Sequence, residues 1–245
     1  MIPKVIHYCW FGGNELPSSA IKCIDSWKKY CPDYEIICWT EDNYDITKYR
    51  YTKEAYAAKK WAFVSDVARL DILYNHGGIY LDTDVEIIKP LDDLLESSGF
   101  MGFEDKKQVA SGLGMGAEKN SDIIKALLDD YRDKRFIGTE GKYDLTPCPV
   151  LNTAVLVRLG LKPDGTYQEI NGFKFFERDV LAPKEATSGR LKYKTANTRS
   201  IHHYDASWQT KEFHKQKKIN HILGGRLGSR VIKLLIALGL MEKVL

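Results

Sequence analysis

Residues 77–86, GGIYLDTDVE, decide the fold of this chain, because a short apolar run stands between a glycine pair and three acids. The run 79–81 is typical of a buried strand, so the acids lie where an inner strand meets solvent. Side chains alternate along a strand that rises about 3.3 Å per residue, so we expect Asp82 and Asp84 to point the same way. Hard cations such as Mg²⁺ and Mn²⁺ bind carboxylates together with substrate phosphates. The pattern therefore predicts a metal-diphosphate site at a strand end, with a solvated acidic turn as the alternative.

The composition is that of an ordinary globular protein, with 245 residues of which 44% are hydrophobic and 28% charged. A chain of this length can bury one sizeable core. The simplest organisation is one α/β domain over residues 1–210 and a helical tail over residues 211–245. The formal net charge of +3 does not require a polyanionic partner, so we expect no nucleic-acid partner.

The five cysteines form no C-x-x-C pair and leave an odd number, which argues against both a zinc site and a disulfide framework. A reducing cytosol suits this usage, so we expect a cytoplasmic protein. The N-terminal residues MIPKVIHYCWFGG lack the features of a signal peptide. The apolar stretch 229–240 is shorter than the roughly 20 residues that span a bilayer, so no transmembrane segment is expected.

The N-terminal segments predict an alternating α/β unit. Residues 4–11, KVIHYCWF, and 34–39, YEIICW, are typical of strands, with a helix at 18–30 between them. Open α/β sheets bind ligands beyond the carboxyl ends of their strands, where Trp10 and Asn43 fall. Trp10 could stack on a nucleobase, and Asn43 could hydrogen-bond a base or ribose. Core packing and turn formation are the ordinary roles of these two residue types.

Residues 54–76 give the most regular predicted helix, and the glycine pair that follows ends it. Apolar side chains at steps of three and four predict one buried stripe. A neighbouring face of small residues includes Ser65, and on it Asp66 and Arg69 are close enough to pair. Because the helix leads directly into the acidic strand, we expect this pair to border the same site. A surface salt bridge is the alternative.

The middle of the chain predicts further α/β elements. Residues 100–104 indicate a strand, residues 122–134 a helix, and residues 150–157 a strand that carries Asn152 as a candidate acceptor contact. Glycines alternate through residues 109–116, which weakens a strand but lets a ligand or another backbone come close.

Residues 200–208, SIHHYDASW, are a second unusual cluster. His202 or His203 could supply a late metal ligand, with Ser207 as a phosphate contact and Trp208 as a ring wall. From Lys211 the chain is basic and then amphipathic. Such a helix suits an anionic lipid surface, and packing on the domain or on a second copy is the alternative.

Three segments together, IPKVIHYCWFGG, SDVARLDILYNHGGIYLDTDVE and HHYDASW, resemble the family 32 glycosyltransferases, which carry an Asp-X-Asp sugar-binding region. That family contains bacterial capsule and lipopolysaccharide transferases and yeast mannosyltransferases, and the glucosylating clostridial toxins are similar to it. The resemblance implies an α/β, Rossmann-like GT-A fold whose central mixed sheet is flanked by helices. It implies dependence on Mn²⁺ or Mg²⁺ and retention of anomeric configuration.

The resemblance also implies the substrates. The donor would be a nucleoside-diphosphate sugar, with a UDP-hexose favoured. The acceptor would be a saccharide or a lipid-linked saccharide, in capsule or lipopolysaccharide synthesis. We expect the protein in the cytoplasm, with peripheral contact to the inner face of the plasma membrane through the C-terminal helix.

Family positions for the donor map onto the N-terminal third of this sequence. By resemblance, Trp10 would stack on the nucleobase and Asn43 would help hold the nucleoside. Ser65, Asp66 and Arg69 match the family's S-D-x-x-R, whose acid and base contact the sugar and ribose region of the donor.

The resemblance assigns the acidic motif to the donor and the metal. Tyr80 would touch the donor, Asp82 would hold the ribose and a metal-bound water, and Asp84 would ligate the metal directly. His202 or His203 would complete the coordination, and the serine and tryptophan at 207–208 would close over the diphosphate. Relatives differ on which histidine aligns, so both are candidates.

The chemistry agrees with these residues. Transfer breaks the bond between the anomeric carbon and phosphate, and a cation held by Asp84 would stabilise the charge that grows on the diphosphate. No acid outside the metal motif stands out as a nucleophile. We therefore expect same-face attack with the departing phosphate as base, while Asp66 orients sugar hydroxyls and Arg69 holds its charge.

Two other classes compete with this interpretation. An aspartyl-phosphate phosphatase also has a strand that ends in D-x-D, but it requires Thr or Val where this chain has Glu86. A non-catalytic carbohydrate- or calcium-binding module needs the acids, but it has no use for Trp10, Asn43 and the face that carries Arg69.

Overall fold

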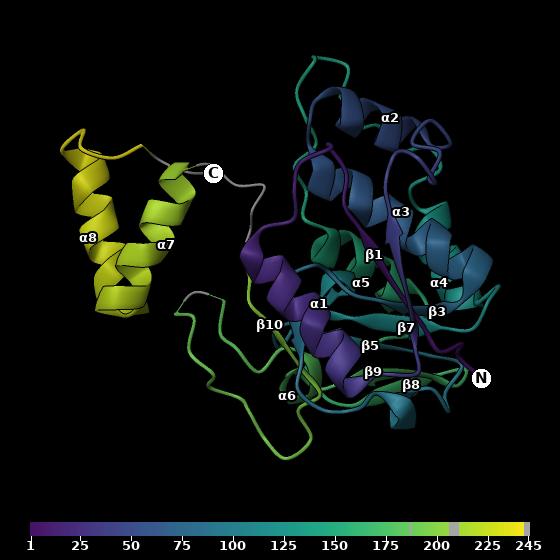
Figure 1. Ribbon diagram of the computed structural model, residues 1–245. Coiled ribbons are helices and arrows are strands. Elements are labelled where there is room, and N and C mark those ends of the chain that lie inside the picture. The colour runs from purple at the N-terminus through teal and green to yellow at the C-terminus, as the bar shows by residue number, and fades with distance from the viewer. Residues whose placement is uncertain (187, 206–210, 243–245) are drawn as a thin grey trace.

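The computed structural model describes residues 1–186, 188–205 and 211–242, and Figure 1 shows helices packed around a central sheet. The strands of this sheet are β1 (Val5–Cys9), β2 (Glu35–Trp39), β3 (Gly78–Tyr80), β5 (Gly99–Phe103), β6 (Val109–Ala110), β7 (Met115–Ala117), β8 (Gln168–Ile170) and β9 (Phe173–Phe176). Within the described residues the order is β2-β1-β3-β7-β5-β9-β8, with β6 paired to β5. Parallel and antiparallel pairs both occur. The predicted α/β fold with a central mixed sheet flanked by helices is confirmed.

β1 lies between β2 and β3 and runs parallel to both. Cys9 pairs with Trp39, and His7 pairs with Tyr80. Leu81 extends the β3 pairing, because its N–H donates to His7 O at 3.0 Å. The carboxyl ends of these three strands therefore meet at one edge of the sheet, which is where open α/β sheets bind ligands.

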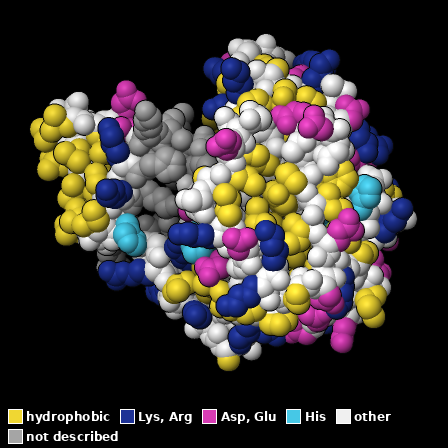
Figure 2. All heavy atoms as spheres, viewed as in Figure 1, with side chains coloured by type: hydrophobic (Ala, Val, Ile, Leu, Met, Phe, Trp, Pro, Cys, Tyr) yellow, Lys and Arg dark blue, Asp and Glu magenta, His cyan; other side chains and the backbone are white. Residues whose placement is uncertain are grey.

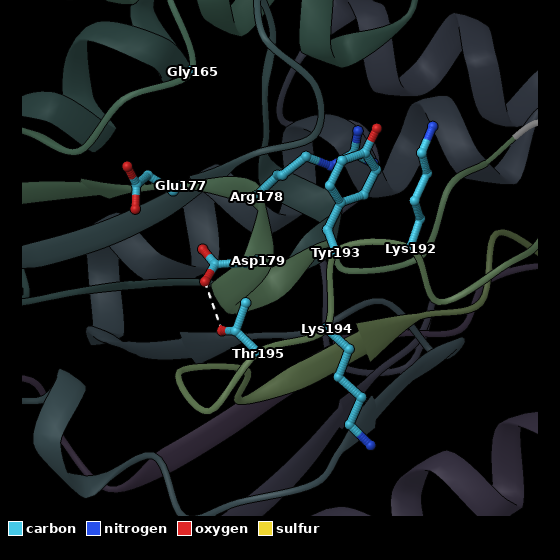
Figure 3. A pocket seen from close by; sticks show the side chains of 8 residues that line it. All are labelled: Gly165, Glu177, Arg178, Asp179, Lys192, Tyr193, Lys194 and Thr195. Atoms are coloured by element: carbon cyan, nitrogen blue, oxygen red, sulfur yellow. Dashed lines mark hydrogen bonds between the residues drawn. The ribbon is translucent and has the colours of Figure 1, made fainter.

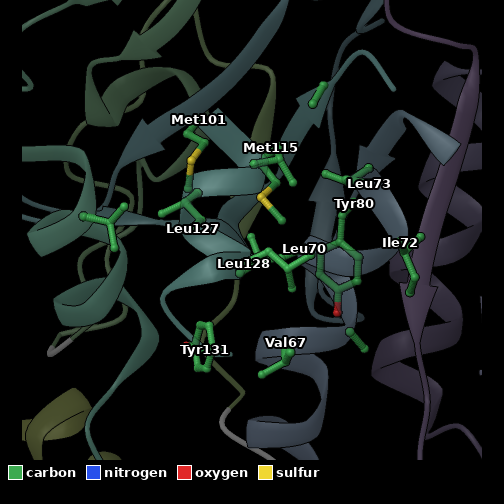
Figure 4. Close-up of a cluster of buried hydrophobic side chains, with 14 of the residues drawn as sticks. Val67, Leu70, Ile72, Leu73, Tyr80, Met101, Met115, Leu127, Leu128 and Tyr131 are labelled. Carbon is green, nitrogen blue, oxygen red and sulfur yellow. The ribbon is translucent and has the colours of Figure 1, made fainter. Parts of the chain in front are cut away.

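Alternation along the strands divides the core between the two faces of the sheet. On one face, Ile6 and Ile79 join Ile24 and Trp27 of α1 (Ser18–Tyr30) in a buried cluster. On the other face, Tyr80 lies among side chains of α3 (Trp61–His76), α4 (Asp122–Asp129) and α5 (Cys148–Arg158) in the larger cluster that Figure 4 shows. Helices thus cover both faces of the sheet, and β3 is buried between them.

The predicted helix 54–76 is wrong as a single span, because the chain forms two helices there, α2 (Arg50–Ala57) and α3. Between them Lys59 has a φ of 56°, a left-handed conformation that ends the first helix. No glycine or proline marks this break, so the usual signals of a helix end are absent there. The other end matches the prediction, since Gly77 has a φ of 69° and its N–H donates to Leu73 O at 2.8 Å.

The predicted strand 150–157 is also wrong, because these residues belong to α5. Their valines and leucines suit a strand by propensity, but Pro149 in the first turn favours a helix start, and the helix packs on α4 and β6. Asn152 therefore lies on a helix, with 2% of its surface exposed. The predicted strand 100–104 is confirmed as β5, and the predicted helix 122–134 is shorter, since α4 ends at Asp129.

The remaining elements surround the acidic motif and form the tail. They are β4 (Val85–Ile87), η1 (Asp92–Leu94), η2 (Ser111–Leu113), α6 (Arg178–Leu181), β10 (Ser200–His202), α7 (Lys211–Leu223) and α8 (Gly225–Ala237). β4 and β10 form a separate two-stranded sheet. α7 and α8 pack against each other as a hairpin that stands beside the body of the protein in Figure 1. In the described part of the chain, every helix is too short or too polar to cross a membrane. All five cysteines are free thiols.

Candidate active site

A tight reversal after β3 puts the acidic motif in place. Val85 N–H donates to Asp82 O at 3.0 Å, and Trp27 Nε1–H of α1 donates to Val85 O at 2.7 Å. β4 then pairs antiparallel with β10, with Val85 opposite His202. This pairing brings the histidine from a distant part of the sequence to the acids.

Asp82, Asp84 and His202 form a cluster of possible metal ligands, because one ligand atom of each lies within 4.8 Å of the others. His202 Nε2 lies 3.1 Å from Asp84 Oδ1, and Asp205 N–H donates to Asp84 Oδ2 at 2.8 Å. Burial acts to raise the pKa of Asp84, but the charge and hydrogen bond of His202 outweigh it and hold this pKa below its ordinary value. Burial acts to lower the pKa of His202, but Asp84 outweighs it and raises that pKa. Each group therefore favours the charged form of the other, and a bound divalent cation would replace the histidine proton.

The donor set fits a divalent cation. Carboxylate oxygens with one imidazole nitrogen suit Mn²⁺ and its neighbours, and hard cations also accept oxygens of substrate phosphate. The ring of His202 meets that of Tyr204 edge to face, with 4.2 Å between centroids. Its Nδ1 is buried and has no hydrogen-bond partner among the described residues. The imidazole is thus held by packing with Nε2 directed at Asp84, as a metal ligand requires.

Of the two candidate histidines, the structure brings His202 to the aspartates. His203 Nε2 lies 2.9 Å from Glu86 Oε2, and its Nδ1 lies 3.2 Å from Lys184 Nζ. Its backbone N–H donates to Asp84 O at 2.9 Å. The side chain of His203 therefore joins a different set of charges, and the metal cluster does not include it.

Arg69 of α3 connects the acids of the site. Its Nη2 lies 3.1 Å from both Asp66 Oδ1 and Asp82 Oδ1. Its Nε donates to Ser65 O at 3.1 Å, and its guanidinium carbon lies 4.9 Å from the centroid of the Tyr80 ring. Only 3% of Arg69 is exposed, so these contacts hold the guanidinium from several sides. The predicted pairing of Asp66 with Arg69 is confirmed, and the pair borders the acidic motif.

Carboxyl groups outnumber the basic groups in this network. Burial raises the pKa of Asp66 to about 6, against the opposing charge of Arg69. Burial also raises the pKa of Asp82, which Arg69 opposes and the negative charge of Asp84 reinforces. Tyr80 Oη donates to Asp82 Oδ1 at 3.1 Å. Among the described residues of this network, the guanidinium of Arg69 and the imidazole of His202 face three carboxyl groups, and a divalent cation would neutralise negative charge on them.

The short helix η2 lies directly over Asp82. Asp82 N–H donates to Gly112 O at 3.4 Å, and a Cβ added at Gly112 would lie 2.2 Å from Asp82 Oδ2. Only the absence of a side chain at Gly112 lets this backbone approach the carboxylate. The alternating glycines of residues 109–116 predicted such a close approach, although Gly112 itself was not predicted as a site residue.

Two further residues join Arg69 without having been predicted. Ser111 Oγ accepts from Arg69 Nη1 at 3.1 Å and from Asn152 Nδ2 at 3.0 Å. Cys148 Sγ lies 3.7 Å from Arg69 Nη1, at the start of α5. Asn152 was a candidate for acceptor contact, and the structure places its amide against Ser111, behind the guanidinium.

The two nucleoside candidates lie beyond the carboxyl ends of β1 and β2. Trp10 is partly exposed, and its Nε1–H donates to Asn14 O at 2.6 Å. Asn43 bonds its own turn, since its Oδ1 accepts from Thr40 N–H at 2.8 Å and its Nδ2 donates to Cys38 O at 2.9 Å. Contact of these side chains with a nucleoside stays a prediction.

Ser65 lies beside Arg69 on α3, and its Oγ donates to Trp61 O at 3.2 Å. Glu104, directly after β5, was not predicted; burial raises its pKa, and the charge of His202 opposes this, so the carboxyl lies within electrostatic reach of the histidine. Ser207 and Trp208 lie outside the described residues.

A pocket of about 430 Å³ lies at α6 and the loop 192–195, and Figure 3 shows its lining. The ring of Tyr193 lies over the guanidinium of Arg178, with 3.7 Å between the guanidinium carbon and the ring centroid. Thr195 Oγ1 donates to Asp179 Oδ2 at 2.7 Å. The charge of Arg178 opposes the rise in the pKa of Glu104.

Comparison with known proteins finds matches in the part of the chain that contains the acidic motif. Residues 17–101 match the family described as the glycosyltransferase sugar-binding region containing the DXD motif. Inositol phosphoceramide mannosyltransferase 3 of Schizosaccharomyces pombe is 38% identical over 98 residues, which cover 38% of this chain and 27% of that protein. Uncharacterized glycosyltransferase L373 of Acanthamoeba polyphaga mimivirus is 35% identical over 101 residues, which cover 39% and 40%. The chain thus spans less than half the length of either relative.

Solved structures show weaker likeness. The PaToxG glycosyltransferase has a TM-score of 0.46 at 22% identity, over 64% of this chain and 69% of that one. The galactosyltransferase LgtC, solved with donor and acceptor sugar analogs, has a TM-score of 0.41 at 14% identity, over 98% and 97% of the two chains.

Proposed function

We infer, from the membership of residues 17–101 in the family of glycosyltransferase sugar-binding regions that contain the DXD motif, that this protein is a glycosyltransferase. We propose that it moves a hexose from a nucleoside-diphosphate sugar to a saccharide or lipid-linked saccharide, with a divalent cation and with retention of anomeric configuration. The observation that carries this proposal is the cluster of Asp82, Asp84 and His202 beside the edge where β1, β2 and β3 end.

Some residues of the cluster would bind the cation, and another would bind the donor. Asp84 and His202 would ligate the cation, and Asp82 would hold the donor ribose and a water on the cation. When bound, a divalent cation supplies positive charge that stabilises the departing diphosphate. The negative charge on the described acids supports this role, because it favours a cation there before any phosphate arrives.

Arg69 would keep the donor side of the site in position. It holds Asp66 and Asp82 through one nitrogen at 3.1 Å each, so the two carboxylates keep fixed orientations before the donor binds. Fixed polar groups stabilise developing charge without the cost of reorganising during the reaction. In this arrangement Asp66 would orient sugar hydroxyls, Tyr80 would contact the donor, and Trp10 would stack on the base.

Retention would proceed by attack on the same face from which the diphosphate leaves. Asp66 is already paired with Arg69, and its pKa is raised to about 6 by burial, so it is better suited to orienting hydroxyls than to forming a glycosyl ester. The departing phosphate oxygen would take the acceptor proton in the same step. This route needs no protein nucleophile.

The donor sugar is proposed as a hexose. The relatives' names add mannose to the UDP-hexoses that the family resemblance suggests, and inositol phosphoceramide in those names supports a lipid-linked acceptor. Capsule or lipopolysaccharide synthesis and a cytoplasmic location at the membrane remain predictions.

The test is release of nucleoside diphosphate from UDP-glucose, UDP-galactose and GDP-mannose, with Mn²⁺ and with a chelator. Wild-type protein should hydrolyse at least one donor slowly in Mn²⁺ only. Asp84→Asn should keep the fold, as measured by circular dichroism, and lose at least about 100-fold in rate, since it removes a group that places the charge-stabilising cation. Asp133→Asn is the matched control, because Asp133 is an exposed aspartate on the surface and should leave the rate unchanged.

Other outcomes identify the competing classes. Wild-type activity in Asp84→Asn would refute the assigned role of the cluster. Failure on every donor, together with trapping by aluminium fluoride, would indicate an aspartyl-phosphate phosphatase. Failure on every donor with no heat of binding for UDP or GDP would indicate a carbohydrate-binding module.

A further inference from the structure

Helix α8 presents a row of leucines to solvent. Leu227, Leu234 and Leu238 are 54%, 59% and 61% exposed, and spacings of seven and four put them on one side of the helix. A different side packs on α7: Ile232 is 7% exposed, and a Cβ added at Gly228 would lie 2.5 Å from a side-chain oxygen of α7. The leucine row therefore stays exposed to solvent after α7 and α8 have packed against each other.

Basic residues border this row. Arg230 and Lys233 are exposed on α8, whose sequence contains no Asp or Glu. Residues 211–245 contain eight Lys and Arg against two Asp and Glu, whereas residues 1–210 contain 28 against 31. Figure 2 shows hydrophobic side chains gathered on the outer edge of the hairpin, with Lys and Arg beside them. The positive charge of the protein is thus concentrated where its apolar surface is most exposed.

We propose that the α7–α8 hairpin lies on an anionic lipid bilayer, with the leucine row inserted among the acyl chains and the basic side chains at the headgroups. The leucine row matches the apolar acyl chains, and the basic side chains match the anionic headgroups. Moving leucine side chains from water to the boundary of the acyl region favours binding. Each Lys or Arg near an anionic surface adds electrostatic attraction to it.

Charge favours a bilayer over a second copy of the chain as the occupant. Pairing two leucine rows would bring the Arg230 and Lys233 of both copies together, and the tail has only Glu212 and Glu242 to oppose them. Like charges that meet at an interface cost binding free energy. An anionic lipid surface has the opposite sign, so the same side chains add to binding there.

The hairpin also ties the bilayer to the candidate active site. α7 begins nine residues after His202, and a fully extended chain of that length reaches about 30 Å. The metal cluster would therefore lie near the lipid surface, within reach of a lipid-linked acceptor; this last point alone depends on the proposed function.

The test is flotation of the full chain with vesicles of phosphatidylcholine that contain about a third phosphatidylglycerol. We expect binding that weakens with salt and is much lower for phosphatidylcholine alone. The triple variant Leu227→Ser, Leu234→Ser and Leu238→Ser should lose detectable binding. Neutralising the border with Arg230→Gln and Lys233→Gln should lower the partition coefficient about 25-fold, at roughly fivefold per charge.

The matched control replaces three other exposed leucines, Leu145, Leu159 and Leu191, by serine. They are 46%, 40% and 48% exposed, and all lie outside the hairpin. This variant should bind as wild type, which separates the leucine row from general surface hydrophobicity. If the serine triple variant lost helix content by circular dichroism, the charge variant, which leaves the leucines in place, would decide.

Three outcomes would overturn the proposal. They are no flotation of the wild type with anionic vesicles, equal loss in the control variant, and a dimer in sedimentation that the leucine variants abolish while vesicle binding is unchanged. Donor hydrolysis without vesicles is measured on the same variants and should equal wild type. Loss of flotation with full hydrolysis would thus concern the hairpin only, and loss of hydrolysis with full flotation would concern the proposed function only.

Discussion

Gly112→Ala should impair the site while leaving the fold intact. The added Cβ would lie 2.2 Å from Asp82 Oδ2 and 3.4 Å from Arg69 Nη1. The backbone itself permits alanine, because Gly112 is not among the positive-φ residues. The substitution therefore acts on the carboxylate of Asp82 rather than on the chain conformation.

The size of the effect follows from the distance. A Cβ ordinarily stays about 3.4 Å or more from its neighbours, so the carboxylate or the η2 backbone must move by about 1.2 Å. A displacement of about 1 Å in a positioning group costs about 100-fold in rate. We expect kcat/KM for donor hydrolysis to fall about 100-fold, or about 2.7 kcal/mol in transition-state stabilisation.

The assay is Mn²⁺-dependent release of nucleoside diphosphate, with the urea midpoint as the measure of stability. Gly138→Ala is the matched control, because a Cβ there would lie 3.4 Å from Lys142 O and the backbone has no positive φ. It should leave both quantities unchanged. An alanine at 112 that retains full activity would show that Asp82 needs no fixed position, which would refute the reasoning.

Three further predictions concern charge. Arg69→Lys should lower the free energy of unfolding by about 3 kcal/mol in urea titrations, because lysine cannot serve both buried carboxylates at once; an unchanged midpoint would contradict the network. His202→Ala should raise the Mn²⁺ concentration needed for half-maximal hydrolysis at least about tenfold, whereas His203→Ala should not, and the reverse result would exchange their roles. Burial lowers the pKa of His7 to about 4 from the ordinary 6.5. The unfolded chain therefore binds the proton first, and the wild type should lose up to about 3 kcal/mol of stability as pH falls from 6.5 to 4, relative to His7→Gln; equal loss in both proteins would count against a neutral buried histidine.

The fold was predictable where local pattern and burial agree. The run 79–81 is apolar, is bounded by glycines and acids, and is buried on both faces, so sequence and structure give the same strand. The failures have a different cause. Lys59 adopts a left-handed conformation, which a lysine in the sequence does not indicate. The segment of α5 is rich in valine and leucine, and it forms a helix because it packs on α4 and β6. Tertiary contacts decide such segments against propensity.

The site was predictable where its members are close in sequence. Asp66 and Arg69 are one helical turn apart, and both precede the acidic motif. Ser111 and Cys148 reach Arg69 only through η2 and the start of α5, and nothing in their own segments indicates this. The choice between His202 and its neighbour depends on which residue of β10 pairs with β4, and this pairing cannot be read from the sequence alone.

The glycine pair at the start of β3 fixes the number of residues between itself and the first aspartate. A Cβ at Gly77 would lie 2.8 Å from Lys119 N, and one at Gly78 would lie 2.8 Å from Val5 O, so both positions are anchored against neighbouring backbone. Three residues then separate Gly78 from Asp82. Exchanging Ile79 or Leu81 for another apolar residue would preserve the geometry, whereas inserting or deleting a single residue would turn the first aspartate to the opposite side of the sheet. Related chains should therefore vary in the identity of the two apolar residues on either side of Tyr80 and never in the number of residues in this interval.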